Sequence, residues 1–316
     1  MVTAVPTSMK AYLCAGPTSL EALRVTELPL PAVPDDGVLI RVHASSTNPV
    51  DLFPLSLAGY LMAGRKPVIL GTDFSGVVES VGSAVRAFRP GDEVFGGGKG
   101  AFAEYMCVSE SRAIALKPSS VPFADAGVVA VAGGTALQAV RDHGRLERGQ
   151  NVLINGASGG VGTFAVQIAR AFGGHVTAVC STRNVETVRA LGAETVIDYT
   201  QSDFTRSGLR YDLIIDIAGS HSFLACKRVL APGGRFVGVG AAALQHRGGG
   251  GFRAIGHFLG TRITSIGSGH RLVSLFIASL KHEDMAFLGE LMADGRIKPV
   301  IDTRYSLAEV PDALRQ

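Results

Sequence analysis

A glycine-rich stretch in the middle of the chain has the residue types that bind a phosphate group. An apolar run at 152–154 predicts a buried parallel strand, glycines fill much of 156–162, and apolar residues at helical spacing follow. Gly159 lets the backbone approach a pyrophosphate, Gly162 lets helix and strand pack closely, and the free amides at the helix start attract the anion. A glycine turn that serves only close packing is the alternative. The residues expected to bind a dinucleotide here are Ser158, Gly159, Gly160 and Val161.

The residues after the next predicted strand, His175–Cys180, favour a cofactor with a 2′-phosphate. A carboxylate there would hydrogen-bond the ribose hydroxyls of NAD and repel a phosphate, but residues 181–184 contain no Asp or Glu. Ser181 can hydrogen-bond a 2′-phosphate, and Arg183 can pair with it through a bidentate fork. The alternative is that Ser181 caps the next helix and Arg183 is solvated. We expect NADPH.

Small residues follow two later predicted strands. An open α/β sheet binds its ligand at the carboxyl ends of its strands, so small side chains at these points leave room for a ribose and a nicotinamide. The residues expected to line this part of the cofactor site are Ala218, Gly238, Val239 and Gly240.

Composition limits the class of protein. The chain has 316 residues, of which 47% are hydrophobic, and can build two domains or one large one. Its net charge of +3 is spread without a Lys/Arg block, so nothing indicates nucleic acid as a partner. No secretory signal and no apolar stretch of membrane-spanning length are visible, so we expect no membrane partner and a cytoplasmic location. Four cysteines without a C-x-x-C pair are typical of a reducing compartment.

The elements that must position these residues change character along the chain. Up to about Val121, short β-rich segments joined by Pro/Gly turns predict a small antiparallel, barrel-like domain. The strands expected there are Val38–His43, Gly76–Val81, Glu93–Phe95 and Phe102–Val108. A helix is expected from Pro122 towards His143, and strands then alternate with helices, which predicts a doubly wound parallel sheet. The strands expected in that sheet are Asn151–Asn155, His175–Cys180, Thr195–Asp198, Tyr211–Ile217, Arg235–Val239 and Arg262–Ile266.

The last quarter of the chain predicts a return to the first domain. Residues 240–260 are expected to form a mobile loop leading into a short apolar helix, and a long helical pattern follows Gly269. From Pro299 the composition resembles that of the first part again. We therefore expect a discontinuous first domain, residues 1–125 and 271–316, around a dinucleotide-binding domain, residues 126–270.

Several blocks resemble the zinc-independent quinone oxidoreductase branch of the medium-chain dehydrogenase/reductase superfamily. They occur in the order and at the spacing of that family over almost the whole chain. The blocks are Asn48-Pro49-Val50-Asp51, Gly71-Thr72-Asp73-Phe74-Ser75-Gly76-Val77-Val78, residues 89–96, Gly133-Gly134-Thr135-Ala136 and residues 156–162. The resemblance implies a GroES-like catalytic domain split around a Rossmann domain, with the active cleft between them. It departs at Gln316, where members usually continue into a closing strand; a truncated chain and a shortened product would look alike here.

The resemblance also implies roles for individual residues. Asn48 would line the cleft near the nicotinamide, Asp51 would support that loop, and Thr135 would touch the nicotinamide or its ribose. Tyr199 is similar to a tyrosine that relatives place beside the 2′-phosphate, and Tyr60 could donate to a substrate oxygen. The alternatives are structural: an Asn holding a turn, an Asp capping a short helix, a Thr bonding back within its helix, and packed tyrosines.

Neither zinc position of the family carries a soft ligand in this chain. Zinc-dependent relatives have a cysteine near Asn48–Asp51 and a Gly-His-Glu where this chain has Gly71-Thr72-Asp73, and a catalytic zinc needs about three protein ligands. The four-cysteine structural lobe is also missing, since only Cys107 follows Gly96 in that region. We expect no metal.

Hydride chemistry without a metal suits an acceptor that is already activated. When hydride adds to a C=C bond conjugated to a carbonyl, charge develops on an enolate oxygen that nearby donors can stabilise. We therefore expect an NADPH-dependent oxidoreductase that acts on small quinones or α,β-unsaturated carbonyls. An enoyl-thioester reductase and a non-catalytic NADPH-binding sensor remain as alternatives. The family pairs through the edge strand of its Rossmann sheet, here expected at Arg262–Ile266, which predicts a homodimer.

Overall fold

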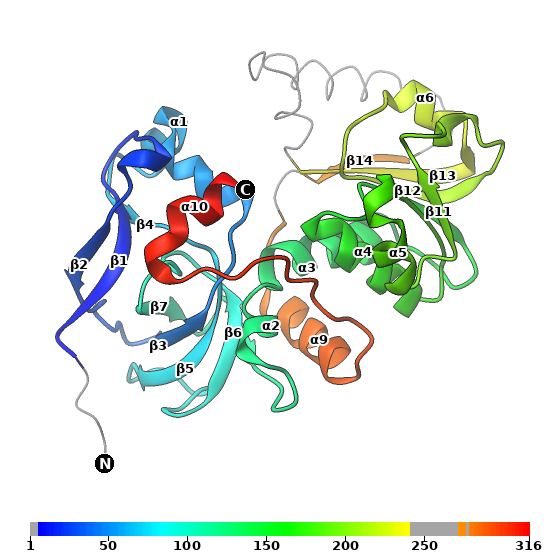
Figure 1. Ribbon diagram of the computed structural model, residues 1–316. Helices are drawn as coiled ribbons and strands as arrows, with labels where there is room; N and C mark the ends of the chain where they lie inside the picture. Colours follow the sequence, from blue (N-terminus) through cyan, green and yellow to red (C-terminus); the bar gives the residue numbers. More distant parts are fainter. Residues whose placement is uncertain (1–5, 241–270, 276–277) are drawn as a thin grey trace. The chain divides into compact units, whose positions relative to one another are not determined.

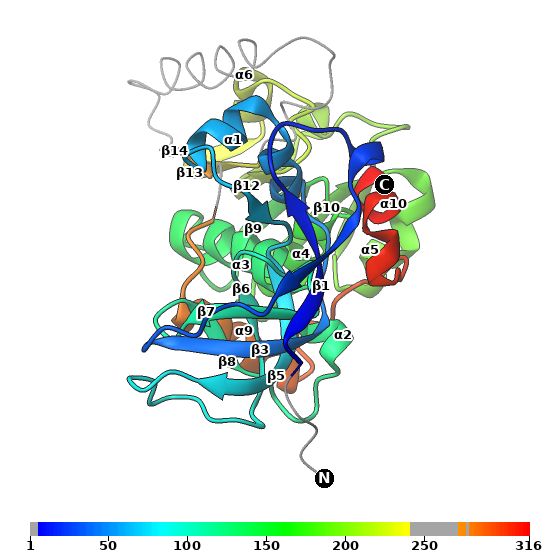
Figure 2. The same ribbon diagram turned by 90° about the vertical axis from the view of Figure 1, so that its left-hand side faces the viewer.

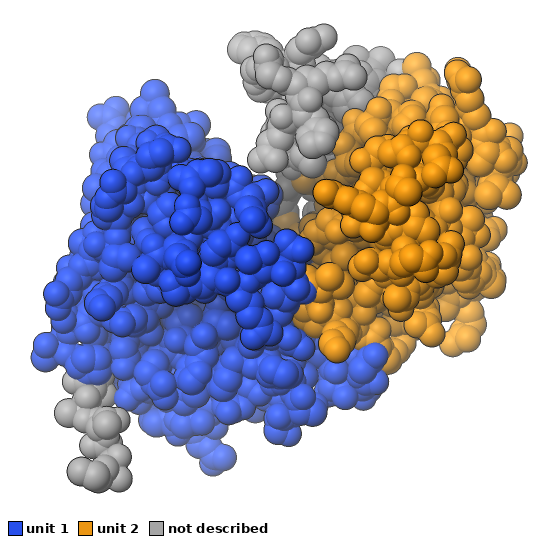
Figure 3. Space-filling model, viewed as in Figure 1, with its two compact units in different colours: residues 1–134, 280–295, 301–316 blue, residues 135–279, 296–300 orange. Residues whose placement is uncertain are grey.

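The computed structural model describes residues 6–240, 271–275 and 278–316, which cluster into two compact units (Figure 3). Both boundaries of these units differ from the ones expected at residues 125 and 271. Unit 1 comprises Met1–Gly134, Leu280–Gly295 and Ile301–Gln316, and unit 2 comprises Thr135–Ser279 and Arg296–Val300.

Unit 1 is built on two antiparallel sheets (Figures 1 and 2). The three-stranded sheet has the order β2-β1-β4 and consists of β1 (Ser8–Cys14), β2 (Val25–Pro29) and β4 (Val68–Ile69). The five-stranded sheet has the order β7-β3-β5-β6-β8 and consists of β3 (Gly37–Ala44), β5 (Asp73–Val81), β6 (Glu93–Gly97), β7 (Tyr105–Ser109) and β8 (Ala113–Leu116). This is the GroES-like, β-rich architecture that the sequence predicted.

Alternating apolar residues explain why the larger sheet holds together. Val38 and Ile40 on β3, with Phe74 and Val78 on β5, are at most 1% exposed and form one core cluster. Burying each such side chain stabilises the fold by roughly 1.5–3 kcal/mol. The short helical elements of unit 1 are η1 (Leu20–Ala22), η2 (Pro49–Leu55), α1 (Leu57–Met62), α2 (Phe123–Ala126), α9 (His282–Ala293), η6 (Leu307–Glu309) and α10 (Val310–Arg315).

Unit 2 is a parallel six-stranded sheet with helical crossovers, the doubly wound fold that the sequence predicted. The strand order is β11-β10-β9-β12-β13-β14, and every pair is parallel. The strands are β9 (Asn151–Asn155), β10 (His175–Cys180), β11 (Thr195–Asp198), β12 (Tyr211–Asp216), β13 (Leu230–Val239) and β14 (Arg271–Leu275). The helical elements are η3 (Gln138–His143), α4 (Gly160–Ala171), η4 (Thr182–Asn184), α5 (Val185–Ala190), η5 (Phe204–Arg206) and α6 (Phe223–Lys227).

One helix continues from unit 1 into unit 2. This is α3 (Ala130–Leu137), which leads directly into the π-helical turn η3. The single helix expected between Pro122 and His143 is therefore divided into α2, α3 and η3. Gly127, which ends α2, is the C-cap residue at the first break.

The sixth described strand of the sheet lies at residues 271–275, where the sequence predicted a helical pattern. β14 pairs with β13 in register, Arg235 opposite Arg271, and forms the edge of the sheet among the described residues. The long helical pattern expected after Gly269 is thus wrong for residues 271–275, and the described helix α9 begins only at His282. The strand expected at Arg262–Ile266 and most of the loop expected at 240–260 lie outside the described residues.

Gly162, in the first turn of α4, should be important for stability because it lets the helix pack closely against β9. A Cβ at position 162 would lie 2.1 Å from the carbonyl oxygen of Gly156, so α4 would have to move away from β9. We expect Gly162→Ala to lower the free energy of unfolding by about 1–3 kcal/mol or more, measured by urea denaturation. Gly159→Ala is the matched control, because its Cβ would meet nothing closer than 3.6 Å, and it should cost less than about 1 kcal/mol. Equal urea midpoints for the two variants would contradict this account.

Candidate active site

The glycine turn between β9 and α4 leaves the start of a helix open to solvent. Gly156 has φ +87°, in the left-handed region that favours glycine. Gly159 is the N-cap residue of α4 and has no side chain to cap the helix, and both Gly159 and Gly160 are exposed. The first amide groups of α4 therefore remain free to bind an anion, and the helix dipole favours one.

Asn184 connects the glycine turn to the end of β10. Its Nδ2 donates to Ser158 Oγ at 3.0 Å and to Ser181 Oγ at 3.2 Å. The two serines predicted separately as cofactor contacts are therefore held together by one amide. Ser181 precedes η4, but its side chain makes no capping hydrogen bond, so the capping alternative is not what the structure has.

The residues around Ser181 include one positively charged and one negatively charged side chain. Arg183 is exposed, and no carboxylate pairs with it in the part of the chain that the structure describes. Tyr199, after β11, is 61% exposed. Asp198, at the end of β11, accepts hydrogen bonds from Thr182 at 2.5 Å and from Thr200 and Gln201. These hydrogen bonds, chiefly the one from Thr182, hold the pKa of Asp198 below its ordinary value. An ionised carboxylate therefore lies on β11, the neighbour of the strand β10 that Ser181 follows.

The two central strands end in a buried polar pair. Asn155 on β9 donates from Nδ2 to Asp216 Oδ1 on β12 at 2.8 Å, and the backbone amide of Gly219 donates to the same oxygen at 2.9 Å. In the strand order, β10 and β11 lie on one side of β9, and β12, β13 and β14 lie on the other. The strand order therefore reverses between β9 and β12, which is the topological switch point at which an open α/β sheet binds its ligand.

The predicted contacts on β12 and β13 lie beside this point. A Cβ on Gly156 would be 3.2 Å from the backbone nitrogen of Ala218, which places Ala218 next to the glycine turn. Gly238 is paired with Asp216 across the sheet. Val239 is buried at the end of β13, and Gly240 follows with φ +75°. The sheet thus brings the predicted residues on either side of β9 to one edge, the carboxyl ends of the strands.

Thr135 lies in the second turn of α3 and is 8% exposed. Its hydroxyl hydrogen-bonds to none of the described residues, and it is not among those with a further unprinted contact. The alternative of a threonine bonded back to the preceding turn of its own helix is therefore not seen. The hydroxyl remains available to a ligand.

Asn48 and Asp51 stand at the start of η2 and are both buried. Asn48 is the N-cap residue, and its backbone amide donates to Asp51 Oδ2 at 2.8 Å. Thr72 donates from its hydroxyl to Asp51 Oδ1 at 2.7 Å. Asp51 therefore does cap a short helix, which was the structural alternative for this residue, and it also fixes the loop that contains Asn48.

A second buried carboxylate, Asp73, holds the side chain of Asn48. Asp73 Oδ2 accepts from Asn48 Nδ2 at 3.2 Å and from Ser46 Oγ at 2.7 Å. Its other oxygen, Oδ1, accepts from the backbone amide of Val131 in the first turn of α3 at 2.8 Å. Ser45 Oγ also donates to the backbone oxygen of Asp73, at 2.6 Å.

Burial shifts the acidity of both carboxylates in the same direction. Burial raises the pKa of Asp51 to about 6, against hydrogen bonds from Thr72 and Asn48 that lower it. Burial raises the pKa of Asp73 to about 7, opposed chiefly by the hydrogen bond from Ser46, while the charge of Asp51 adds to the rise. Both groups therefore change protonation close to neutral pH.

Tyr60 lies on α1 (Leu57–Met62). It is half-buried, and its hydroxyl makes no hydrogen bond within the described residues. The same helix exposes Leu57 by 62%, Leu61 by 47% and Met62 by 79%, next to an exposed Phe53 on η2. An apolar surface thus lies beside the loop that contains Asn48 and Asp51.

No group of three His, Cys, Asp or Glu side chains in the described part of the chain is arranged to hold a metal ion. In particular, Thr72 and Asp73 are engaged in the hydrogen bonds given above. Among the helices described, none is long and apolar enough to cross a membrane. The four cysteines are free thiols, three of them buried and Cys107 partly exposed.

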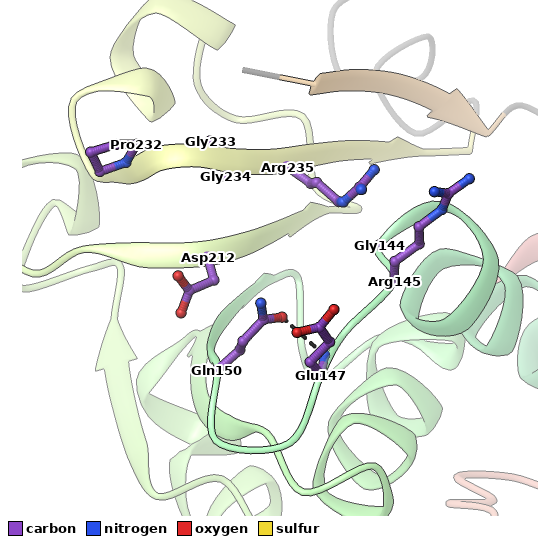
Figure 4. Close-up of a pocket in the computed structure, with 9 residues that line it drawn as sticks. All are labelled: Gly144, Arg145, Glu147, Gln150, Asp212, Pro232, Gly233, Gly234 and Arg235. Atoms are coloured by element: carbon purple, nitrogen blue, oxygen red, sulfur yellow. Dashed lines mark hydrogen bonds between the residues drawn. The ribbon is translucent and has the colours of Figure 1, made fainter. Parts of the chain in front are cut away.

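A separate hollow of about 330 Å³ opens at the other edge of the parallel sheet, where the strands begin (Figure 4). Gln150 precedes β9 and accepts from the backbone amide of Glu147 at 2.9 Å, and Asp212 lies near the start of β12. The hollow is therefore distinct from the switch point. The residues that line it are Gly144, Arg145, Glu147, Gln150, Asp212, Pro232, Gly233, Gly234 and Arg235.

Sequence reasoning missed three residues that organise these sites. Asn184 stands in the predicted phosphate loop, and its spacing of three from Ser181 could have indicated the hydrogen bond. Asp73 was considered as a possible metal ligand and not as a positioning residue, although an Asp within an apolar strand requires partners when it is buried. Nothing in the sequence around Ser46 indicated its role, because its hydrogen-bond partner Asp73 lies 27 residues away.

Comparison with known proteins agrees with this architecture. The model of the alcohol dehydrogenase GroES-like domain matches residues 34–119, and that of the zinc-binding dehydrogenases matches residues 191–316. The chain is 32% identical over 312 residues to the chloroplast envelope quinone oxidoreductase homolog of Arabidopsis thaliana, covering 94% of this chain and 90% of that one. It is 33% identical over 334 residues to the trans-enoyl reductase pgmF of Aspergillus terreus, and this match covers 98% of this chain and 92% of that one.

Solved structures give the same result. The quinone oxidoreductase from Coxiella burnetii superposes with a TM-score of 0.81 at 28% identity, covering 98% of this chain and 95% of that one. Members of this group bind a nicotinamide dinucleotide and act on small molecules. From its motifs, its two folds and these relatives, the chain is an oxidoreductase that belongs to the medium-chain dehydrogenase/reductase superfamily, in its quinone oxidoreductase branch.

Proposed function

We propose that the protein is a zinc-independent, NADPH-dependent reductase that transfers hydride to quinones or to the C=C bond of α,β-unsaturated carbonyls. The observation that carries the proposal is the uncapped start of α4 at the topological switch point, which offers free amide groups to a pyrophosphate. The proposed contacts there are Ser158, Gly159, Gly160 and Val161, with Ala218, Gly238, Val239 and Gly240 beside the ribose and nicotinamide. Two relatives are named a quinone oxidoreductase homolog and a trans-enoyl reductase, which supports quinones or α,β-unsaturated carbonyls as the acceptors.

When bound, the cofactor would supply the hydride, and the chain's own residues bind and orient the cofactor and the acceptor. We assign to Thr135 a contact with the nicotinamide or its ribose, because the residue is 8% exposed and its hydroxyl has no partner within the described residues. We assign to Asn48 a contact at the reacting groups, and to Asp51 the support of its loop. Tyr60, whose hydroxyl also has no hydrogen-bond partner in the described part of the chain, is the proposed donor to the acceptor's oxygen, where negative charge develops.

The preference for NADPH over NADH rests on the residues after β10. Ser181 and Arg183 are available to a 2′-phosphate. Tyr199 is exposed after β11, and its backbone amide donates to the carbonyl oxygen of Cys180 at 3.1 Å, next to Ser181. Asp198 opposes this preference, because an ionised carboxylate repels a phosphate. Its oxygens already accept four hydrogen bonds, which spread its charge. We therefore give the larger effect to the free guanidinium of Arg183.

Two further properties are proposed. The described sheet ends in β14, whose outer edge has no partner strand among the described residues, and an open edge of this kind supports pairing of two copies into a homodimer. The four free thiols support a reducing compartment such as the cytoplasm.

Activity should not depend on a metal ion. The positions that hold ligands in zinc-dependent relatives are occupied here by Thr72 and Asp73, which hydrogen-bond to neighbouring side chains. We expect NADPH oxidation to survive exhaustive treatment with a strong chelator, and elemental analysis to find no stoichiometric zinc. Activity that disappears with the chelator and returns only with zinc would overturn this part of the proposal.

Cofactor selection can be tested with two charge changes that act in opposite directions. Arg183→Ala removes a charge-assisted contact and should weaken NADPH binding by about 1.5–3 kcal/mol while leaving NADH binding nearly unchanged. Asp198→Asn removes the repelling charge and should strengthen NADPH binding. Fluorescence titration of both nucleotides against wild type and variants measures these effects. A wild type that prefers NADH, or an equal loss of both nucleotides in Arg183→Ala, would refute the assignment.

The chemistry is tested by single-turnover oxidation of bound NADPH with small quinones, enones and enoyl thioesters. If Thr135 and Asn48 contact the reacting groups, alanine at either position should lower the rate by about 10- to 1000-fold and change NADPH affinity little. Unchanged rates for the folded variants would remove both residues from the site. Turnover of enoyl thioesters alone would favour the biosynthetic reductase, and a wild type inert to all three acceptors would favour the NADPH sensor.

A further inference from the structure

The orientation of the Asn48 amide depends on one buried carboxylate. Asn48 Nδ2 lies 3.2 Å from Asp73 Oδ2, and Asp73 is fully buried. An ionised carboxylate can only accept hydrogen bonds, so the nitrogen of the amide and not its oxygen must face Asp73. Ser46 Oγ accepts from the same nitrogen at 3.3 Å and donates to the same carboxylate oxygen at 2.7 Å. The direction of every bond in this triangle follows from the charge on Asp73.

The second oxygen of Asp73 acts on the helix that leads to Thr135. Oδ1 accepts from the backbone amide of Val131 at 2.8 Å. This amide belongs to the first turn of α3, where amide groups lack partners within the helix and where a negative charge is favourable. Thr135 follows Val131 by four residues, one turn further along the same helix. One carboxylate therefore fixes both the Asn48 side chain and the start of the helix that contains Thr135.

We propose that Asp73 is a positioning residue of the reductase: its ionised carboxylate sets which end of the Asn48 amide faces the reacting groups and anchors the first turn of α3. This extends the proposed function and rests on it only for the role of Asn48 at the reacting groups. When Asp73 takes up a proton, its hydroxyl donates to Asn48 and the amide turns over, exchanging Nδ2 and Oδ1. The protonated and ionised forms of Asp73 therefore present different atoms of Asn48.

The charge that acts on Asp73 comes from the neighbouring carboxylate. Among the described residues, Asp51 is the titratable group that contributes to the raised pKa of Asp73, while Ser46, Val131 and Asn48 contribute hydrogen bonds that lower it. A pKa of about 7 means that Asp73 is ionised above neutral pH and protonated below it. The productive orientation of Asn48 should accordingly form as the pH rises through about 7.

The test is Asp73→Asn, which imitates the protonated acid at every pH. Its Oδ1 can still accept from Val131, but its Nδ2 now faces Asn48 and forces the amide of Asn48 to turn. Since an amide also avoids burying a charge, the urea midpoint should stay close to that of the wild type. Single-turnover hydride transfer should fall about 10- to 100-fold, NADPH affinity should hold, and the rise in rate through about pH 7 should disappear.

Asp51→Asn is the matched control. Its Oδ1 can accept from the Asn48 backbone, and its Nδ2 can donate to the Thr72 hydroxyl, because a hydroxyl can reverse its role. This variant should keep the rise in rate with pH and move it to lower pH, because the charge that raises the pKa of Asp73 is gone. A wild-type rate and pH profile in Asp73→Asn, or a rise that persists there, would overturn the proposal.

A readout that needs no turnover separates this inference from the proposed function. The chain has four asparagines, at 48, 151, 155 and 184, so selective ¹⁵N-asparagine labelling gives four side-chain amide signals, and Asn48→Ala identifies that of Asn48. In the wild type this signal should shift with a midpoint near pH 7, and in Asp73→Asn it should not. A signal that stays constant from about pH 5.5 to 8.5, or that titrates equally in Asp73→Asn, refutes the role of Asp73. Failure of every acceptor to oxidise NADPH would instead refute the proposed function.

Discussion

The contact between the first turn of α4 and the end of β9 is the constraint on which the dinucleotide-binding unit depends. Gly162 lies so close to the carbonyl oxygen of Gly156 that no side chain fits between them. This close approach sets the start of α4 directly above the switch point of the sheet, and it leaves the first amides of the helix pointing past Gly159. The same glycines that let the backbone pack therefore create the proposed phosphate site, so packing and binding cannot be separated at this turn.

The sequence predicts those parts of the fold whose signal is local. The predicted bounds of β9, β10 and β11 match those of the structure. In β9 and β10 every residue after the first is buried, and a strand buried on both faces reads as a continuous hydrophobic run. Strands β1 and β2, which pair with each other, were missed, because strand propensity depends on the packing of side chains against neighbouring elements. The helical pattern expected after Gly269 was wrong at Arg271–Leu275 for a similar reason, since this segment is a strand that pairs with the distant strand β13.

The residues of the candidate site also divide into those with a local signal in the sequence and those without one. Ser181 and Arg183 could be proposed from the sequence because they follow a predicted strand directly, at the position where the fold would bind a 2′-phosphate. The role of Asp73 could not, because its partners Ser46, Asn48 and Val131 lie 27, 25 and 58 residues away and are brought together only by the fold. A short motif identifies residues that contact a ligand, but it does not identify the residues that hold those contacts in place.

Hydrogen bonds can take over the organising role that a metal has in zinc-dependent relatives. A metal fixes side chains from distant segments because each ligand must point at one centre. In this chain Thr72 and Asp73 turn inward instead, Thr72 to Asp51 and Asp73 to Asn48, so two carboxylates tie β5 to the loop at Asn48. Such a network costs the burial of charge, which is why the pKa values of both carboxylates rise towards neutrality. Under the proposed zinc-independent chemistry, these two buried carboxylates would make the site sensitive to protons, whereas a metal centre is sensitive to chelators.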